Sequence, residues 1–145
     1  MKSINHHAPV TCASSIVIHT SPERVWAVLT DINGWASWQN DIFKPKLNDD
    51  LVSGSTFVWT TGGVKIRSTL HTVEPHRAFG WTGKAPGTFA IHNWTLAAHE
   101  EATLVSVEES MEGFLVRLFK NPFRKNLEKG MNTWLQLLKQ ACEGV

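Results

Sequence analysis

The order of apolar and polar positions divides the chain into a short strand with two short helices, a long stretch of strands, and a final long helix. Residues 14–19 alternate in hydrophobicity and predict a strand whose isoleucines share one face. Ser21 is a favourable N-cap and Pro22 suits the first position of a helix, so a short helix is expected next. A second short helix is expected over residues 34–38, after a break at Asp31.

The middle of the chain predicts an antiparallel meander. Gly62-Gly63 suits a hairpin turn that needs positive φ, and Pro86-Gly87 suits a type II turn. No alternation of strands with helices supports a parallel sheet. The strands are expected over residues 43–47, 56–61, 64–73, 78–83, 88–97 and 103–111.

Residues 115–143 predict a long helical segment, which Pro122 kinks or restarts. Beyond this proline, apolar residues recur at spacings of three and four, as in an amphipathic helix. The expected fold is therefore α+β: a curved antiparallel sheet of six to seven strands wraps around the final helix and leaves a cleft. We expect a single domain over residues 1–145, with residues 1–11 as a loosely ordered N-terminal extension.

Composition and charge exclude several classes of protein. The chain is 42% hydrophobic and only 19% charged, which excludes a disordered protein, and its net charge of +1 gives no general attraction to nucleic acid. No apolar run is long enough for a signal peptide or a transmembrane segment. We therefore expect a cytoplasmic protein that holds Cys12 and Cys142 as free thiols and uses no cofactor.

Basic side chains concentrate near the C-terminus, in a segment that also contains two phenylalanines. A solvated helix face is the simplest interpretation, and a weakly bound protein or anionic partner is the alternative. Either a monomer or a homodimer is consistent with the sequence. The basic residues are Arg117, Lys120, Arg124, Lys125 and Lys129.

Three motifs follow one another along the chain: Ser-Pro-Glu-Arg-Val-Trp at 21–26, Ile-His-Asn-Trp-Thr-Leu at 91–96, and Val-Glu-Glu-Ser-Met-Glu-Gly at 107–113. Together they resemble the SRPBCC superfamily of START-like, helix-grip proteins, and within it the polyketide cyclase/dehydrase-like branch. The resemblance covers about residues 12–143 and implies the helix-grip fold. Because the superfamily includes small-molecule binders, enzymes and partner-binding proteins, the resemblance does not fix the chemistry. The turn at 100–104 departs from the family's usual glycine-rich pattern, so its shape is expected to differ.

Strand register predicts which side chains share the inner face of the sheet. Counting outward from the turns places Trp59 opposite Ile66 and Trp81 opposite His92. The same counting places Glu109 opposite His92 on the last strand. We expect a ligand cavity lined by this face and by two residues of the final helix: Phe57, Trp59, Ile66, Ser68, Trp81, His92, Trp94, Val107, Glu109 and Met111, with Leu127 and Met131.

His92 and Glu109 are the only ionisable groups on this predicted face, and three interpretations remain open for them. They form a buried structural pair that is hydrogen-bonded to itself, a polar anchor for a ligand, or an acid–base pair. We expect a protein that binds an apolar or aromatic small molecule, lipid-like or polyketide-like. The alternatives are a cyclase/dehydratase-like enzyme that uses this pair, and a protein-interaction module. No spacing of histidines and cysteines predicts a metal site.

Overall fold

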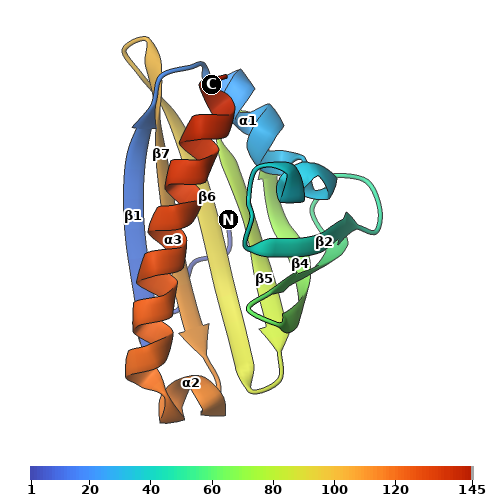
Figure 1. The fold of residues 1–145 in the computed structure, drawn as a ribbon, viewed down its shortest axis with the longest axis vertical. Helices are drawn as coiled ribbons and strands as arrows, with labels where there is room; N and C mark the ends of the chain where they lie inside the picture. The colour runs from blue at the N-terminus through green and yellow to red at the C-terminus, as the bar shows by residue number, and fades with distance from the viewer. Residues whose placement is uncertain (145) are drawn as a thin grey trace.

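The computed structural model describes residues 1–144 as a seven-stranded antiparallel sheet with a long helix packed along one face (Figure 1). The strand order is β1-β7-β6-β5-β4-β3-β2. This architecture confirms the expected α+β helix-grip fold. The elements are β1 (Val10–Ile18), α1 (Pro22–Thr30), the 3-10 helix η1 (Ile32–Ser37), β2 (Ile42–Leu47), β3 (Thr56–Thr61), β4 (Val64–Glu74), β5 (Ala78–Ala85), β6 (Thr88–His99), β7 (Ala102–Glu112), α2 (Phe114–Leu118) and α3 (Lys120–Cys142).

Local sequence signals explain where the helices begin. The Ser21 side chain accepts a hydrogen bond from the Arg24 backbone N–H at 3.3 Å, and Pro22 is the first residue of α1, as predicted. The final helical segment breaks at Phe119, before the proline. Pro122 lies in the first turn of α3, where its missing N–H costs no intrahelical bond, so this proline restarts the helix and does not kink it.

The hairpin registers agree with the counting from the turns. Trp59 pairs with Ile66, and His92 pairs with Trp81 on one side and with Glu109 on the other. Every strand except β3 is longer than expected. In particular, β6 and β7 run to a two-residue turn in which Glu100 adopts a positive φ of 56°. This tight turn is the region where the sequence departs from the family pattern.

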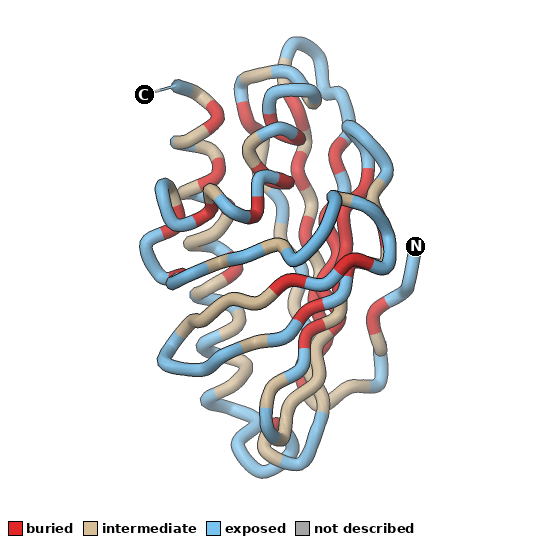
Figure 2. Tube along the Cα trace, turned by 90° about the vertical axis from the view of Figure 1, so that its right-hand side faces the viewer, coloured by how far each residue is buried: buried red, intermediate tan, exposed pale blue. Residues whose placement is uncertain are grey.

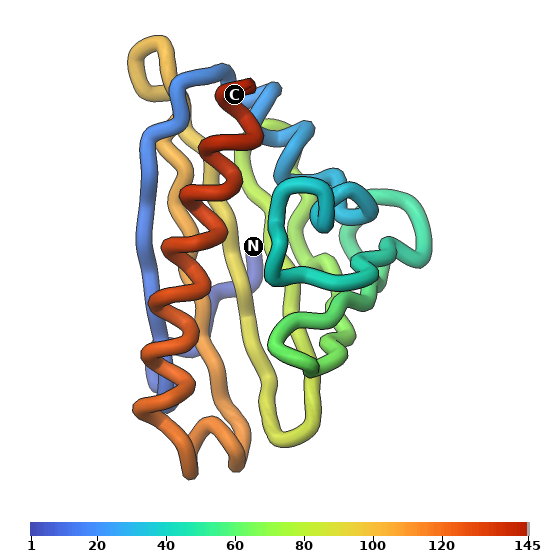
Figure 3. Tube along the Cα trace, in the orientation of Figure 1, coloured from blue at the N-terminus to red at the C-terminus, as the bar shows by residue number. Residues whose placement is uncertain are grey.

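The N-terminal segment packs on the sheet, and its last two residues, Val10 and Thr11, already belong to β1. It lies against the outer face of the sheet, opposite α3 (Figure 3). The Asn93 side chain donates a hydrogen bond to the backbone oxygen of Lys2 at 2.8 Å, and the Asn5 backbone donates to Ser110 at 3.0 Å. Ile4 is buried. The polar residues of this segment form hydrogen bonds with polar groups on the sheet surface, and such contacts leave no hydrophobic pattern in the sequence.

Buried residues run along the strands in the middle of the molecule and alternate with exposed residues along α3 (Figure 2). Met131, Leu135, Leu138 and Cys142 form the buried side of this helix. Over residues 1–144, none of the helices is both long and apolar enough to cross a membrane.

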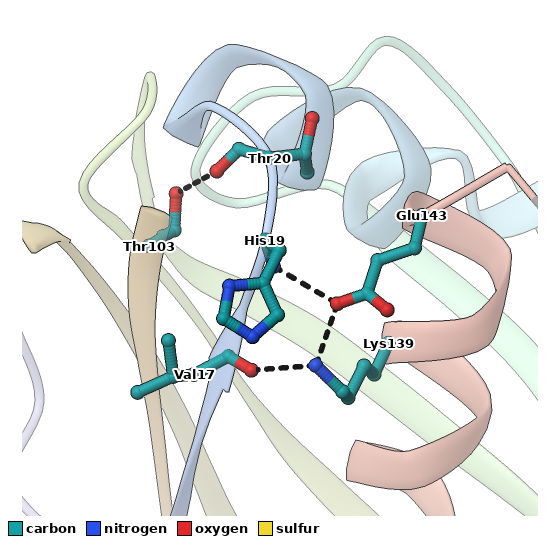
Figure 4. Close-up of polar contacts among 6 residues, drawn as sticks. All are labelled: Val17, His19, Thr20, Thr103, Lys139 and Glu143. Atoms are coloured by element: carbon teal, nitrogen blue, oxygen red, sulfur yellow. Dashed lines mark hydrogen bonds and ion pairs between the residues drawn. The ribbon is translucent and has the colours of Figure 1, made fainter. Parts of the chain in front are cut away.

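A polar cluster ties the end of α3 to β1 (Figure 4). Lys139 Nζ donates to the Val17 backbone oxygen at 3.0 Å and to the Glu143 carboxylate at 2.6 Å. The same carboxylate accepts from the His19 backbone N–H at 2.9 Å. The hydrogen bond from Lys139 and then that from His19 hold the pKa of Glu143 below its ordinary value of 4.5.

We expect Glu143→Gln to lower the Tm by a few degrees at neutral pH, because the amide weakens both contacts. A carboxylate with a lowered pKa contributes stability above pH 4.5 and loses it as the pH falls through the folded-state value. The Tm difference between the two proteins should therefore vanish in acid. Thermal unfolding followed by circular dichroism across this pH range tests it, with Glu101→Gln in the exposed β6–β7 turn as control. A difference that persists in acid contradicts the prediction.

Candidate functional site

A row of side chains crosses the inner face of the sheet from β1 to β5. Cys12 on β1 pairs with Glu109 on β7, Glu109 pairs with His92 on β6, and His92 pairs with Trp81 on β5. Because cross-strand partners point to the same side, the four side chains form one continuous line. The only buried histidine and carboxylate of residues 1–144 therefore lie side by side against α3.

His92 is held from two directions. Its ring stacks on Trp81 with centroids 4.4 Å apart and planes within 4° of parallel. Its Nδ1 is hydrogen-bonded to Glu109 Oε1. Since a carboxylate only accepts, Nδ1 carries the proton. In the neutral ring Nε2 then presents a lone pair, and its direction is fixed by the stacking and by Glu109.

Two nitrogens at this site are buried without a hydrogen-bond partner in the described residues: His92 Nε2 and Trp94 Nε1. The two rings lie 5.5 Å apart between centroids. A buried polar group that lacks a partner costs roughly 1–3 kcal/mol. The site thus offers one acceptor and one donor, which a bound molecule could satisfy together.

Trp134 covers these two rings from α3. Its centroid lies 6.3 Å from that of His92 and 5.8 Å from that of Trp94, and its side chain is only partly buried. Trp35 from η1 packs edge-on against it at 5.1 Å. Both tryptophans belong to the site, although the register argument, which considered only strands, did not place them there.

The predicted lining residues divide into two groups. Phe57, Trp81, Trp94, Val107 and Met131 are buried in the core cluster, and Ser68 is buried beside them, accepting a hydrogen bond from Trp59 Nε1 at 3.0 Å. The other predicted apolar residues are half-buried. Three of them lie outside the core cluster: Ile66, Met111 and Leu127.

The open cavity expected between α3 and the sheet stays a prediction. Tryptophan rings pack between α3 and the sheet. Two surface hollows lie elsewhere. One of about 530 Å³ lies on the outer face of the sheet near Asn93 and Ser106, and one of about 320 Å³ lies beside α1 near Trp38.

Gly130, one turn before Trp134 in α3, is an uncrowded position. A Cβ atom at this position would meet no other atom within 4 Å, and the residue is half-buried. A glycine inside a helix costs about 1 kcal/mol relative to alanine. The helix is therefore both uncrowded and locally weakened next to the tryptophan that covers His92.

Cys12 completes the row, but it is not suited to act as a nucleophile. Burial, followed by the negative charges of Glu128 and Glu109, raises the pKa of its thiol, so the reactive thiolate is disfavoured. Burial likewise raises the pKa of Cys142 to about 11. Both thiols are free in the structure. Sequence reasoning missed Cys12 because it began the first strand at residue 14, although the alternation continues back to Val10.

The fold and this inner-face site define a helix-grip protein of the START-like class. The sequence matches a family model described as polyketide cyclase/dehydrase and lipid transport over residues 9–143, and the chain belongs to this family. A sequence search of curated proteins finds no significant match.

Solved structures share the fold at low sequence identity. A hypothetical protein from Helicobacter pylori superposes with a TM-score of 0.85 at 15% identity, over 98% of this chain and 97% of its own. A START superfamily protein from Mycobacterium smegmatis gives 0.78 at 12% identity, covering 92% and 97%. An aromatase/cyclase from a Streptomyces species gives 0.77 at 15% identity, covering 92% and 93%. At such identities, these structures support the fold alone.

Proposed function

We propose that the protein binds a small molecule that joins an apolar ring system to a hydroxyl group, with His92 as the polar anchor. The observation that carries this proposal is the buried, unpartnered Nε2 of His92 inside an aromatic enclosure. Apolar walls with a few placed polar groups are typical of small-molecule sites. The family description, which includes polyketide cyclases and lipid transport, is consistent with such a ligand.

The chemistry of the two free nitrogens narrows the ligand class. Nε2 of the neutral His92 ring accepts a hydrogen bond, so it favours a hydroxyl or phenol on the ligand. Trp94 Nε1–H donates and favours a carbonyl or ether oxygen. A hydroxyl and a carbonyl on neighbouring ring positions, as in an aromatic polyketide, would satisfy both.

Entry of this ligand requires Trp134 to move, because its ring lies close to the rings of both His92 and Trp94. The side chain is only partly buried, and the uncrowded position at Gly130 lies one helical turn away. Displacement of one partly exposed ring exposes less apolar surface than a movement of the sheet would. We therefore place the entrance on the side of α3 where Leu127, Gly130 and Trp134 are half-buried.

The test compares 2-naphthol with naphthalene, two probes that differ by one hydroxyl, through titration calorimetry. Wild type should bind 2-naphthol about 5- to 100-fold more tightly, the range for pairing one buried polar group. His92→Phe should remove most of this preference, whereas Glu109→Gln, whose amide oxygen can still accept from Nδ1–H, should retain part of it. His99→Phe, on the exposed end of the same strand, is the matched control and should retain it.

Equal affinity of the wild type for the two probes would exclude His92 as a hydrogen-bonding anchor. If His99→Phe also lost the preference for 2-naphthol, the loss in His92→Phe could not be assigned to the His92 side chain. Native mass spectrometry of freshly purified protein complements the titration, because a co-purified molecule bearing rings and hydroxyls would identify the natural ligand class.

A cyclase/dehydratase-like enzyme is the second candidate, favoured by the same Glu109–His92 pair. With its Nδ1 proton directed at the carboxylate, His92 could remove a proton through Nε2 as a general base. Cys12, the next residue along the row, offers no thiolate. This candidate is established if the wild type turns over a ring-forming poly-β-ketone substrate and His92→Phe does not. The variant should still bind naphthalene, which shows that its site is intact.

A further inference from the structure

Large apolar side chains are exposed together at one end of the molecule. Phe114, Leu118 and Phe119 are 66%, 71% and 54% exposed, and they occupy α2 and the residue that joins it to α3. We call this segment, residues 114–120, the α2 tip. It forms the foot of the molecule below α3 (Figure 1). An exposed apolar group of this kind on a protein surface commonly marks an interaction site.

Basic side chains predominate along the chain near the α2 tip. Between Gly113 and Leu127 there are four basic side chains and no acidic one, and the nearest carboxylates in the sequence are Glu112 and Glu128. Arg117, Lys120 and Lys125 are exposed, whereas Arg124 donates a hydrogen bond to the Pro9 backbone oxygen at 3.2 Å. The tip therefore presents aromatic and aliphatic groups within a positively charged surround.

The α2 tip is held in place and does not hang free. Val116 on its inner side is fully buried, and the Leu115 backbone donates to the Gly87 oxygen at 3.2 Å. A Cβ atom at Gly87 would lie 2.6 Å from the Leu115 side chain, so the turn between β5 and β6 has room for α2 only because residue 87 is glycine. This packing keeps Phe114 and Leu118, one helical turn apart, directed outward.

We propose that the α2 tip docks the protein onto an anionic membrane surface, with its apolar side chains in the headgroup region and its basic side chains on acidic lipids. Exposed aromatic and leucine side chains surrounded by lysine and arginine are typical of interfacial binding. A specific protein partner would need about 800 Å² on each side, more than a five-residue helix presents. This inference does not rest on the ligand site proposed above.

Co-sedimentation with vesicles tests the docking. The protein should bind phosphatidylcholine vesicles that contain phosphatidylglycerol and should bind pure phosphatidylcholine far more weakly. Phe119→Ser should weaken binding about tenfold through lost apolar burial. Lys120→Gln with Lys125→Gln should weaken it about 25-fold, at roughly fivefold for each charge. High salt should reduce wild-type binding but should affect the lysine variant less.

Phe43→Ser is the matched control, because Phe43 is 62% exposed on β2, outside the tip. This variant should bind the vesicles as the wild type does. Docking through the tip is overturned if Phe119→Ser binds vesicles as the wild type does, or if Phe43→Ser weakens binding as much as Phe119→Ser does. It is also overturned if the protein binds both vesicle types equally. If the protein binds neither vesicle type and instead forms a dimer that Phe119→Ser dissociates, the tip is an interface between two copies of the chain.

Discussion

Replacement of Trp35 by alanine should lower the free energy of unfolding by roughly 3–5 kcal/mol, the range for removing a large aromatic side chain from a core. Trp35 is fully buried and packs against Phe57, Trp81 and Trp134, with centroids between 5.1 and 5.5 Å away. Its Nε1–H donates to the Leu29 backbone oxygen at 2.9 Å. The substitution therefore leaves a cavity and an unpaired carbonyl at the end of α1.

Urea unfolding followed by far-UV circular dichroism measures this loss without relying on tryptophan fluorescence. Trp38→Ala is the matched control, because Trp38 follows closely in the chain but is partly exposed. It should lower the free energy of unfolding clearly less than Trp35→Ala does. Trp35→Phe keeps a ring and loses the hydrogen bond, so it should fall between alanine and wild type. A loss below about 1 kcal/mol for Trp35→Ala would mean that the aromatic cluster is not the centre of the core.

The register of the sheet could be predicted from the sequence because short hairpin turns fix it. Gly62, Gly63 and Gly87 adopt positive φ angles of 57°, 77° and 70°, so the turns lie where the glycines predicted them. A turn of known length determines every pair along the hairpin. The juxtaposition of His92 and Glu109 follows from the same counting across the β6–β7 turn at Glu100 and Glu101, which no glycine marks.

The covering of the site could not be predicted in the same way. Trp35 and Trp134 lie on η1 and α3, and their distance from the sheet depends on how those elements cross it. Helix periodicity shows which side of a helix is buried but not what it meets. For the same reason the sequence could not show how several tryptophan rings pack between α3 and the sheet.

The N-terminal residues illustrate a second limit. Lys2 and Asn5 are held by hydrogen bonds to the outer face of the sheet rather than by apolar periodicity. Side chain–backbone contacts across a long sequence separation leave no local pattern. Cys12, in contrast, could have been found, because Val10 and Cys12 continue the alternation of the first strand.

The double substitution His92→Leu, Glu109→Leu should leave the protein at least as stable as wild type and more stable by up to about 4 kcal/mol. Replacement of a buried, hydrogen-bonded polar pair by apolar side chains is often stabilising, because two polar groups no longer need to be removed from water. The unpartnered Nε2 of His92 is lost as well. Each single substitution should instead destabilise. His92→Leu should do so more strongly, by roughly 3–5 kcal/mol, because it leaves a buried carboxylate unpaired.

Urea unfolding of the four proteins in a double-mutant cycle tests this expectation, together with the two naphthalene probes. A double variant that is stable but no longer prefers 2-naphthol would show that the pair is kept for binding at the expense of stability. A double variant that loses more than about 1 kcal/mol would show the opposite: the pair would then serve the core, and its two side chains would be satisfied structural partners. The stability of the double variant therefore separates the two roles, because removing both groups leaves neither of them buried without a partner.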